Sequence, residues 1–379
     1  MTIGVDIRSL SGKNHSGVEE YTLNILTHLI KSAPEAYFKL FSNSFKKQPD
    51  KYQWNNNPNA RLYNFKIPNR IFSSVSRILN IPKIDKMLGG CDVFFSPHFH
   101  IAPVSKKCKK VITFHDLSFV RYPEFFSLKQ NIWHKTQMNP QKQAQEADKI
   151  IAVSESTKTD LIELFGINEN KIKVIYSGID DKFFETERDD INIAVKNKYH
   201  LPSNYVLFLG TLEPRKNIVG IIKAFELLSR IGEFQDFHLV LAGNIGWRSE
   251  EVFDAIKKSS CRSRIIVTGS VESFERRAIY QNAKLFVYPS FFEGFGFPPL
   301  EAMASGMPVI TSNGSSLPEV VGDAALLIDP YNVEEIFGTM KLLLLDEELC
   351  QSYVLKGKER AKKFSWTKSA EETLGVLVS

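Results

Sequence analysis

The sequence predicts an α/β protein built from two Rossmann-like, doubly wound domains. Short β-rich apolar runs alternate with longer amphipathic stretches from end to end, and this order is typical of parallel sheets covered by helices on both faces. The chain has 379 residues, more than one ordinary core holds. The strand pattern also breaks once, over residues 180–202, where charged and polar residues replace it.

Eleven apolar runs are expected to form strands, in two series separated by that break. Between them, apolar residues recur at three- and four-residue spacing. Tyr21, Ile25, Leu26 and Leu29, for example, share one face of a helix expected over Glu19–Ile30. The expected strands are Thr2–Ile7, Asp92–Ser96, Lys110–Phe114, Lys149–Val153, Ile172–Tyr176, Tyr205–Gly210, His238–Ala242, Ile265–Thr268, Leu285–Tyr288, Val309–Thr311 and Ala325–Ile328.

The break predicts the domain boundary. We expect a first domain over residues 1–180, a linker and entry segment (DDKFFETERDDINIAVKNKYHLP), and a second domain over residues 203–364. In doubly wound folds, ligands bind outside the carboxyl ends of the strands. Two such domains predict one cleft shared by the carboxyl ends of both sheets.

Composition and cysteine spacing limit the class of protein. Hydrophobic residues make up 43% and charged residues 24% of the chain, which is a globular balance. No window approaches the roughly eighteen apolar residues that a spanning helix needs, and the first residues carry no signal-peptide pattern. The four cysteines lie far apart in the sequence, without a C-x-x-C pair. We therefore expect a cytoplasmic protein without a disulfide framework or a zinc site.

Charge is divided unevenly along the chain. Residues 1–180 contain 25 Lys and Arg against 16 Asp and Glu, whereas residues 181–379 contain 23 against 27. A basic first half is typical of a surface that faces an anionic partner such as nucleic acid or a membrane. A solvated basic surface without a partner explains the same numbers equally well.

The richest motif is YPSFFEGFGFPPLEAMASGMPV over residues 288–309, which predicts a strand, a glycine loop and a helix. Gly294 and Gly296 allow a close approach of the backbone to a ligand, and prolines suit the opening of a helix. The start of that helix is an anion site. Glu293 precedes the loop and Glu301 is placed in the first helical turn, so both carboxylates are expected to border one pocket. The alternative is that Glu301 only complements the helix dipole and that Glu293 is only a charged residue of the loop.

A second motif, GTLEPRKN over residues 210–217, follows the first strand of the second half. Arg215 offers a planar fork for phosphate oxygens and Lys216 a compact positive charge. At the carboxyl end of a strand, these two cations can neutralise a diphosphate. An exposed pair at the entry of a helix is the alternative.

Together, the two motifs resemble the retaining glycosyltransferases of family 4, which have the GT-B architecture. That family's E-x7-E signature is present as Glu293 to Glu301, with an R-K pair before it. Nearly the whole chain takes part in the resemblance. The further matching blocks are DIR (6–8), SGVEEY (16–21), ITFHDL (112–117), AVSES (152–156), LPEVVGDAALL (317–327) and FSWTKSAE (364–371).

The resemblance implies a role for each matching position. Arg215 and Lys216 would bind the donor diphosphate, and Glu293 would hold hydroxyls of the donor sugar. His115 would sit at the reacting sugar, with Asp116 nearby. The closing helix over residues 365–379 would return to the first domain. The positions implied as catalytic are His115, Arg215, Lys216 and Glu293, and those implied to bind the donor are Gly17, Asp116, Arg215, Lys216, Gly294, Phe295, Gly296, Leu300 and Glu301. The family's first-loop glycines form a closer pair than Gly12 and Gly17 do here.

From the resemblance we expect a metal-independent transferase that retains anomeric configuration, needs no cofactor and takes a nucleotide-sugar donor. GDP-mannose is the expected donor, because the pattern looks like that of bacterial mannosyltransferases of surface polysaccharides. The expected acceptor is a saccharide or a lipid-linked saccharide. The alternatives are a UDP-sugar-dependent glucosyl- or galactosyltransferase, a non-catalytic sugar-nucleotide-binding partner, and an epimerase or hydrolase on the same fold.

The remaining signals are weaker. His98 and His100 could bind a metal, although a wall on the acceptor side of the cleft is favoured. Two stretches are basic: Lys106, Lys107, Lys109 and Lys110 before a strand, and residues 70–87, which mix apolar side chains with Arg70, Arg77, Lys83 and Lys86. They predict peripheral contact with an anionic membrane, or else an ordinary packed helix. The chain has no G-x-G-x-x-G after its first strand, no phosphate-binding P-loop and no nucleic-acid-binding motif.

Overall fold

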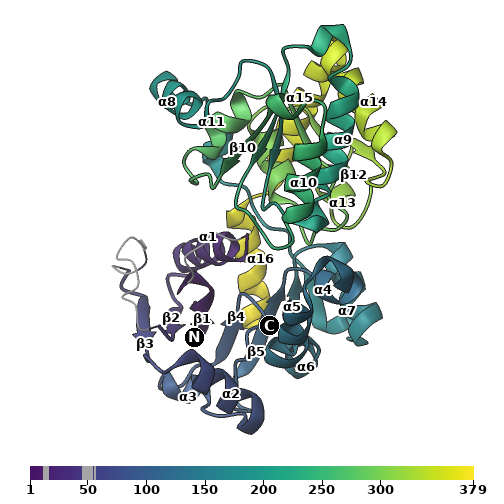
Figure 1. Cartoon of the computed structure of the whole chain (residues 1–379). Coiled ribbons are helices and arrows are strands. Elements are labelled where there is room, and N and C mark those ends of the chain that lie inside the picture. The colour runs from purple at the N-terminus through teal and green to yellow at the C-terminus, as the bar shows by residue number, and fades with distance from the viewer. Residues whose placement is uncertain (12–16, 45–53, 55–56) are drawn as a thin grey trace. The chain divides into compact units, whose positions relative to one another are not determined.

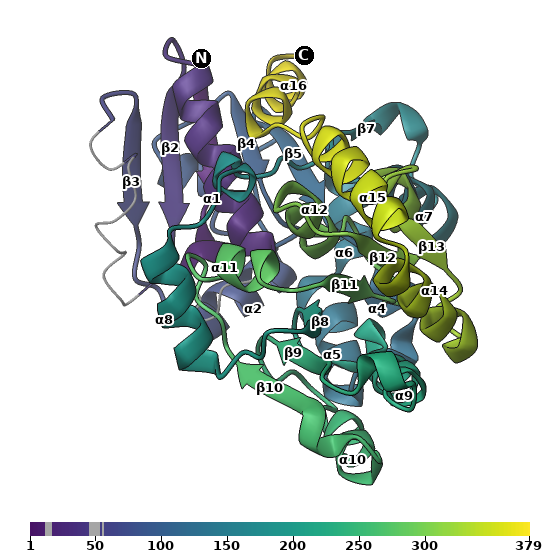
Figure 2. The ribbon, with the colours of Figure 1, turned by 90° about the horizontal axis from the view of Figure 1, so that it is seen from above.

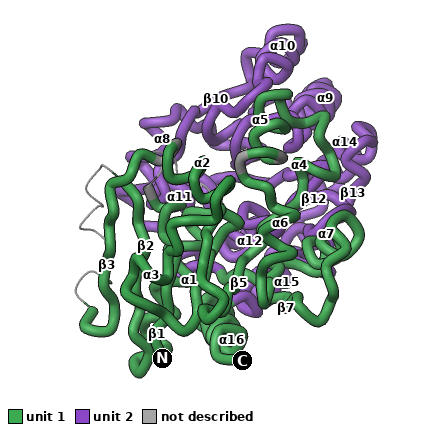
Figure 3. The backbone as a smooth tube through the Cα atoms, turned by 90° about the horizontal axis from the view of Figure 1, so that it is seen from below, with its two compact units in different colours: residues 1–178, 365–379 green, residues 179–364 purple. Residues whose placement is uncertain are grey.

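The computed structural model describes residues 1–11, 17–44, 54 and 57–379. Gly12 and Ser16, which belong to the first-loop pattern, lie outside the described residues. The chain folds into two compact units (Figure 3). Unit 1 comprises residues 1–178 and 365–379, and unit 2 comprises residues 179–364.

Unit 1 is built on a parallel sheet in the order β3-β2-β1-β4-β5-β6-β7. The chain leaves β1 toward β2 and β3, then crosses to β4 on the other side of β1, so β1 and β4 flank the point where the winding reverses. The strands are β1 (Thr2–Asp6), β2 (Tyr37–Ser42), β3 (Ala60–Asn64), β4 (Val93–Ser96), β5 (Lys109–Phe114), β6 (Lys149–Ala152) and β7 (Ile172–Val174).

Helices cover both faces of this sheet. α1 lies on one side, packed with α16, whereas α2, α3 and α6 lie on the other (Figure 1). The expected apolar face of α1 is confirmed, since Tyr21, Ile25, Leu26 and Leu29 are all buried. The helices of unit 1 are η1 (Arg8–Ser11), α1 (Gly17–Ser32), α2 (Asn69–Leu79), α3 (Ile84–Met87), α4 (Ser118–Arg121), η3 (Pro123–Phe125), α5 (Leu128–Trp133), the π-helical η4 (His134–Met138), α6 (Pro140–Glu146), α7 (Glu155–Phe165), η5 (Glu169–Lys171) and α16 (Trp366–Val378).

The chain returns to unit 1 through α16, which packs on α1 (Figures 1 and 2). Ser365 caps α16 by accepting a hydrogen bond from the Lys368 N–H. A Cβ on Gly178 would lie 2.1 Å from the Trp366 nitrogen, so only glycine fits where the outgoing and returning chains pass each other.

Unit 2 repeats the architecture with the sheet order β10-β9-β8-β11-β12-β13, also parallel throughout. Its reversal point lies between β8 and β11. The elements are η6 (Asp181–Phe184), α8 (Asp189–Tyr199), β8 (Tyr205–Leu209), η7 (Pro214–Lys216), α9 (Ile218–Leu228), η8 (Gly232–Phe234), β9 (His238–Ala242), α10 (Glu250–Lys258), η9 (Arg262–Arg264), β10 (Ile265–Gly269), α11 (Arg276–Gln281), β11 (Leu285–Tyr288), α12 (Phe297–Ala304), β12 (Val309–Ser312), α13 (Leu317–Val321), β13 (Leu326–Ile328), α14 (Val333–Leu345) and α15 (Glu347–Ala361).

All eleven expected strands are present, to within one or two residues at their ends. β2 and β3 were not among the expected strands. Lys39 interrupts the apolar pattern of β2, and the edge strand β3 (ARLYN) has no residue that is fully buried. An edge strand buries little of either face, so its sequence carries a weak strand signal.

Residues 180–202, expected to be a linker and the entry into the second domain, all belong to unit 2, so the segment is part of that unit and not a linker. It forms η6 and α8 and buries Phe183 and Tyr199. Arg277 of α11 holds the segment by donating to the Lys182 carbonyl at 2.6 Å and to Glu187 at 2.7 Å. The segment looks like a linker in sequence because much of its packing uses ion pairs.

Cys91 and Cys108 are close in space, with their Sγ atoms 3.5 Å apart, and both are free thiols. One further expectation is corrected in unit 1. Lys110 does not share an exposed basic surface with Lys106 and Lys107. It is buried, and its Nζ donates to Gln143 Oε1 at 2.8 Å. In the described part of the chain, no helix is long and apolar enough to cross a membrane.

Candidate active site

In unit 2 the predicted site residues gather at the reversal point of the sheet. β8 pairs with β11, although almost eighty residues separate them in the chain. Arg215 and Lys216 lie in η7, just beyond β8, and Glu293 lies just beyond β11. Parallel strands end at the same edge, so both loops meet there, where doubly wound folds bind their ligands.

The two cations and Glu293 form one buried ion cluster. Lys216 Nζ lies 2.5 Å from Glu293 Oε1, and Arg215 Nη1 lies 2.9 Å from Glu293 Oε2. Arg215 also pairs with Glu213 at 2.7 Å and donates to the Phe292 carbonyl at 2.5 Å. Ser290 Oγ donates to Glu293 Oε1 at 2.6 Å. The carboxylate of Glu293 is thus oriented by three separate donors.

The charges in this cluster balance. Burial acts to raise the pKa of Glu293, but the charges of Arg215 and Lys216 outweigh it and lower the pKa to about 2. Burial and the neighbouring Arg215 lower the pKa of Lys216, while Glu293 acts in the opposite direction. With Glu213 included, two cations face two carboxylates, so Glu293 stays ionised and the buried cations are compensated.

Tyr288 is a member of the cluster that the sequence analysis did not assign. Lys216 Nζ donates to its hydroxyl at 2.6 Å. The Tyr288 ring stacks on Phe208 and Phe286, with ring centroids 5.6 Å and 5.9 Å away. Burial raises the pKa of Tyr288, and the charge of Glu293 acts in the same direction. The hydroxyl is therefore a neutral, fixed acceptor for the Lys216 ammonium.

The glycine loop after Glu293 is held by serines that follow β12. Ser315 Oγ accepts from the Glu293 N–H at 2.9 Å, and Ser316 Oγ donates to the Glu293 and Phe295 carbonyls at 2.9 and 2.8 Å. Gly296 has φ +113°, and a Cβ there would lie 2.9 Å from Leu317. Glycine is therefore required at 296 for both its backbone angle and its packing.

α12 begins at Phe297, with Pro298 and Pro299 in its first turn as predicted. Phe295 and Leu300 are buried and support this turn. Glu301, expected in the first turn, lies in the second, because the helix starts one residue before the prolines.

Glu301 belongs to a different network from Glu293. It is 1% exposed, and Arg276 Nη1 lies 3.0 Å from its Oε1. Tyr280 donates to Oε2 at 2.9 Å. Both partners come from α11, in the neighbouring connection. The E-x7-E spacing therefore places its carboxylates in two separate clusters of the same unit.

In unit 1, His115 follows β5 and its tautomer is set by the backbone. The ring Nε2 lies 2.7 Å from the Pro97 carbonyl, which can only accept a hydrogen bond, so Nε2 carries the proton. Burial lowers the pKa of His115, and the neutral ring therefore has an acceptor at Nδ1. Tyr21 packs edge-on against the ring at 4.8 Å.

The other unit 1 candidates lie on neighbouring connections. Gly17 is the first residue of α1, one turn before Tyr21. Asp116 Oδ1 accepts from Ser118 Oγ at 2.8 Å, two residues before α4 begins. The His98 ring lies 4.8 Å from that of His100 and 5.7 Å from that of His115. In the described residues, no three His, Cys, Asp or Glu side chains are grouped as metal ligands.

The structure thus brings the predicted unit 2 residues to one edge of one sheet, and the unit 1 residues to the ends of β4 and β5 and the start of α1. Sequence reasoning missed the residues that hold them. Tyr288 and Ser290 were part of the quoted motif, but only the pairing of β8 with β11 shows what they contact. Ser315 and Ser316 follow β12, which pairs with β11, and Arg276 lies in α11, the helix that leads into β11. These positions in the strand order are the signal that could have found them.

Comparisons with known proteins match segments in both units. Residues 15–183 match the family described as Glycosyltransferase Family 4, and residues 189–360 match the family described as Glycosyl transferases group 1. O-antigen chain mannosyltransferase B of Escherichia coli is 31% identical over 285 residues, which cover 75% of this chain and 73% of that protein. The chain is a family 4 glycosyltransferase.

One further sequence relative and one solved structure are also similar to this glycosyltransferase. The serotype-specific mannosyltransferase WbdA of Escherichia coli is 35% identical over 237 residues, 62% of this chain but only 29% of that protein. The crystal structure of Anabaena HepE in complex with UDP and glucose superposes with a TM-score of 0.75 at 17% identity, covering 100% of this chain and 99% of that one. At that identity the likeness establishes the fold, which is the expected GT-B type with two Rossmann-like domains.

Proposed function

We propose that this glycosyltransferase transfers a mannosyl group from GDP-mannose to a saccharide acceptor, with retention of anomeric configuration, in the synthesis of a surface polysaccharide such as an O antigen. The reaction type rests on one observation, the Arg215, Lys216 and Glu293 cluster at the reversal point of unit 2. The choice of sugar rests on relatives at 31–35% identity that are named mannosyltransferases.

The cluster fits departure of a nucleoside diphosphate. The bond between the anomeric carbon and the phosphate oxygen breaks, and the electron pair stays on the phosphate. Negative charge grows there. Lys216 is buried and Arg215 is 12% exposed, and both cations are already fixed in place by hydrogen bonds. Fixed charges stabilise the transition state without reorganising, and that stabilisation speeds the reaction. The N-terminus of α12 adds amide donors to the same edge.

Glu293 and His115 are proposed to position the sugar. The three donors on Glu293 fix its carboxylate rigidly, which suits an acceptor for sugar hydroxyls. The neutral His115 presents Nδ1 as a second acceptor. Glu301 is proposed to hold the nucleotide ribose together with Arg276. Because the two cations neutralise the leaving group, the proposed reaction needs neither a metal ion nor a cofactor.

The test is a transfer assay with GDP-mannose, UDP-glucose and UDP-galactose, using mannose-containing oligosaccharides as acceptors. Transfer from GDP-mannose alone, with an α-linked product detected by NMR, supports the proposal, because the donor itself is α-linked. Transfer only from a UDP sugar would leave the glycosyltransferase class intact and overturn the mannosyl assignment. Release of free sugar or an epimerised donor without acceptor would favour the hydrolase or epimerase alternative.

A further inference from the structure

Four histidines lie at or near the carboxyl ends of β4 and β5, and the proposed reaction uses only His115. His98 and His100 follow β4, and His134 is the first residue of η4. The ring centroid of His98 lies 4.8 Å from that of His100 and 5.7 Å from that of His115, and His134 is close enough to influence the pKa of His98. Doubly wound folds bind ligands at this edge of the sheet, so the other rings are candidates for contact with a substrate.

His98 and His134 share one feature: Nδ1 of each ring is buried and has no hydrogen-bond partner in the described part of the chain. Burial lowers the pKa of both rings, so each is neutral at pH 7 and carries its proton on one nitrogen. A buried N–H without an acceptor is rarer than a buried lone pair without a donor. The proton is therefore on Nε2 in both residues, and Nε2–H is the donor that each ring offers.

The donors of His98 and His134 complement the acceptor of His115. No hydrogen bond joins either side chain to another described residue, so their Nε2–H groups remain available to a ligand. His115 has the opposite arrangement, because its Nε2–H donates to the Pro97 carbonyl and its Nδ1 is the acceptor. A sugar hydroxyl both donates and accepts hydrogen bonds, and this edge offers groups of both kinds.

Aromatic packing holds the two donor rings in place. The His134 ring stacks on that of Phe119, with 4.3 Å between the centroids and 7° between the planes. The Phe119 ring lies 5.9 Å from that of Phe99, and the Phe99 ring lies 4.1 Å from that of His98. Phe99 and Phe119 are both buried. Rings that are fixed before binding lose little conformational entropy when a ligand arrives.

The charges at this edge favour an uncharged ligand. Burial lowers the pKa values of His115 and His134, and the charge of the Asp116 carboxylate acts in the opposite direction on both. Arg8, whose charge acts on His98, is paired with Asp6 at 2.6 Å. A carboxylate repels a phosphate, whereas neutral N–H groups suit the hydroxyl groups of a sugar.

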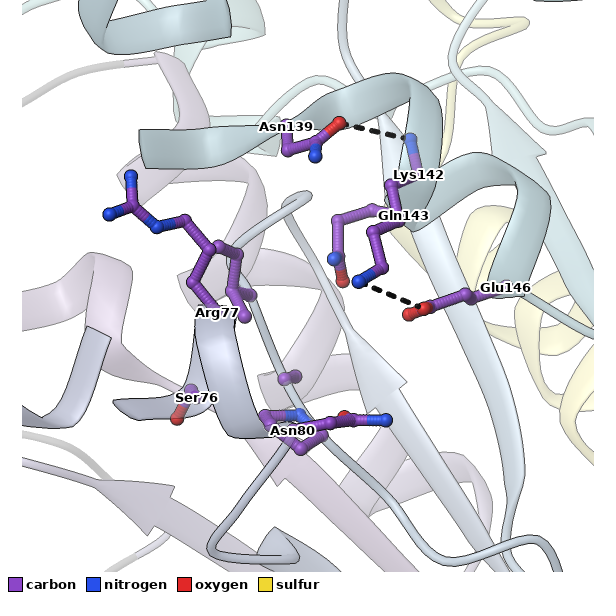
Figure 4. A pocket seen from close by; sticks show the side chains of 10 residues that line it. Ser76, Arg77, Asn80, Asn139, Lys142, Gln143 and Glu146 are labelled. Atoms are coloured by element: carbon purple, nitrogen blue, oxygen red, sulfur yellow. Dashed lines mark hydrogen bonds and ion pairs between the residues drawn. The ribbon is translucent and has the colours of Figure 1, made fainter. Parts of the chain in front are cut away.

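Cations line a pocket between α2 and α6 instead. Arg77 and Lys142 stand on facing walls, and Lys142 pairs with Glu146 at 3.7 Å (Figure 4). This pocket has a volume of about 40 Å³, which is room for a few waters, whereas pockets for small organic ligands measure about 300–1,000 Å³. A saccharide is therefore assigned to the histidines and not to this pocket.

We propose that His98 and His134 recognise the acceptor saccharide: each donates a hydrogen bond from Nε2 to a hydroxyl oxygen of its terminal sugar, which places that sugar beside His115. This inference rests on the proposed transfer to a saccharide and assigns the residues of unit 1 that bind the acceptor. Both histidines act on acceptor binding and not on departure of the diphosphate.

Phenylalanine variants test the two donors. His98→Phe and His134→Phe keep an aromatic ring and lose the N–H, and each should raise the acceptor KM about 3- to 10-fold with kcat unchanged. The acceptor is the trisaccharide of mannose, glucose or galactose that the parent chain glycosylates. Affinity for the nucleotide-sugar donor, measured without acceptor, should stay the same. His98→Gln carries an amide N–H close to the position of the lost Nε2–H and should recover most of the affinity, whereas the shorter His98→Asn should not.

His28→Phe is the matched control. His28 is a half-buried histidine of α1, eleven residues beyond Gly17, which places it about 16 Å along the helix from the carboxyl edge. This variant should leave the acceptor KM unchanged. Because Nδ1 of His98 and of His134 has no partner among the described residues, the phenylalanine variants should keep the unfolding temperature of the parent. A loss of acceptor affinity then reports the missing N–H.

Two NMR measurements complete the test. Nitrogen-15 spectra of the histidine-labelled chain at neutral pH should show the Nε2–H tautomer for His98 and His134, and Nδ1–H in either ring overturns the proposal. Saturation-transfer spectra with the three trisaccharides and no donor separate acceptor binding from the proposed function. A parent chain that binds GDP-mannose or a UDP sugar but none of the trisaccharides overturns the proposal.

Trisaccharide binding that depends on His98 and His134, without binding of any nucleotide sugar, supports the assigned acceptor site and overturns the proposed function. An unchanged acceptor KM in both phenylalanine variants means that the rings only pack, and it overturns the proposal. An equal loss of donor affinity in these variants does the same, because the histidines would then belong to the donor site.

Discussion

Lys216 Nζ and the Tyr288 hydroxyl lie 2.6 Å apart, although 72 residues separate them in the chain. Lys216 is thus held from two sides, by a neutral phenol and by the carboxylate of Glu293. The phenol is itself fixed between two phenylalanine rings. Tyr288 is accordingly a positioning residue for a cation proposed to stabilise the leaving group.

Replacing Tyr288 with phenylalanine tests this role. Tyr288→Phe removes the acceptor from a buried ammonium, and we expect about 1.5–3 kcal/mol less unfolding free energy. Because Lys216 loses its fixed position, turnover should fall about 10- to 100-fold. Denaturant unfolding and steady-state kinetics measure the two effects.

Tyr205→Phe is the matched control. Tyr205 is buried in the neighbouring strand β8, and its hydroxyl donates to the Ile279 carbonyl at 2.7 Å. Tyr205→Phe should lower the unfolding free energy to a similar degree as Tyr288→Phe but leave turnover unchanged. Equal turnover losses in the two variants would show that the effect of Tyr288→Phe is only structural.

Removing the Lys216 ammonium should have a larger effect. Lys216→Ala is expected to lower kcat about 10²–10³-fold, or roughly 3–4 kcal/mol, which is typical for loss of one fixed charge-stabilising donor. Lys198→Ala removes an ammonium that is 50% exposed and paired with Glu275 in the same unit, and should leave kcat unchanged. Unchanged turnover in Lys216→Ala would remove its catalytic role.

The Glu301 and Arg276 pair is expected to contribute to stability as well as to donor binding. Glu301→Ala leaves the Arg276 charge without its carboxylate, and we expect the unfolding free energy to fall by about 3 kcal/mol. This is the low end for a broken buried ion pair, because the Arg276 side chain is 17% exposed. Adding Arg276→Ala should recover part of that loss. Denaturant unfolding of the two single variants and of the double variant measures the coupling energy between Glu301 and Arg276. Purely additive losses of unfolding free energy would contradict a coupled pair.

Histidines in unit 1 should make the protein acid-sensitive. Burial lowers the pKa values of His98, His115 and His134 below 6.5, and lowers that of His100 to about 4. Unfolded histidines protonate near pH 6.5 and folded ones do not, so the unfolded state gains stability as the pH falls. The unfolding temperature should therefore be level above about pH 6.5 and decline from there toward pH 4.

The same pH series with His100→Asn checks the assignment. This variant removes one depressed pKa and should decline less steeply between pH 6.5 and 4. A decline of the same slope would mean that other groups, such as buried carboxylates, cause the acid sensitivity.

Chelation tests the proposed absence of a metal requirement. If Arg215 and Lys216 supply the positive charge at the leaving group, transfer in excess EDTA should equal transfer without it. Loss of activity that Mg²⁺ or Mn²⁺ restores would show that the cations alone are insufficient. Dialysis against EDTA before the assay excludes slow release of a bound ion.

Much of the fold could be predicted because its signals are local. Buried parallel strands are continuous apolar runs, and these runs marked eleven strands. β3 escaped notice because an edge strand needs no such run. Residues 181–202 resemble a linker in sequence because polar contacts hold much of the segment. Arg277 binds η6 and Glu187, and Glu275 binds Lys198 and Tyr199 of α8. The burial of Lys110 was not predicted for a related reason: burial depends on which elements pack together.

Local patterns in the chain are enough to predict the two parallel-sheet domains, the family, and the placement of two cations and a carboxylate at strand ends. The tertiary structure alone decided their partners: Tyr288 for Lys216, Arg276 for Glu301, and the Pro97 carbonyl for His115. The physical reason is range. Apolar periodicity records which side of an element is buried, and a motif records chemistry along one loop. The pKa of a side chain and the hydrogen bonds that fix it depend on neighbours within a few ångströms, which strand order brings together from distant parts of the chain.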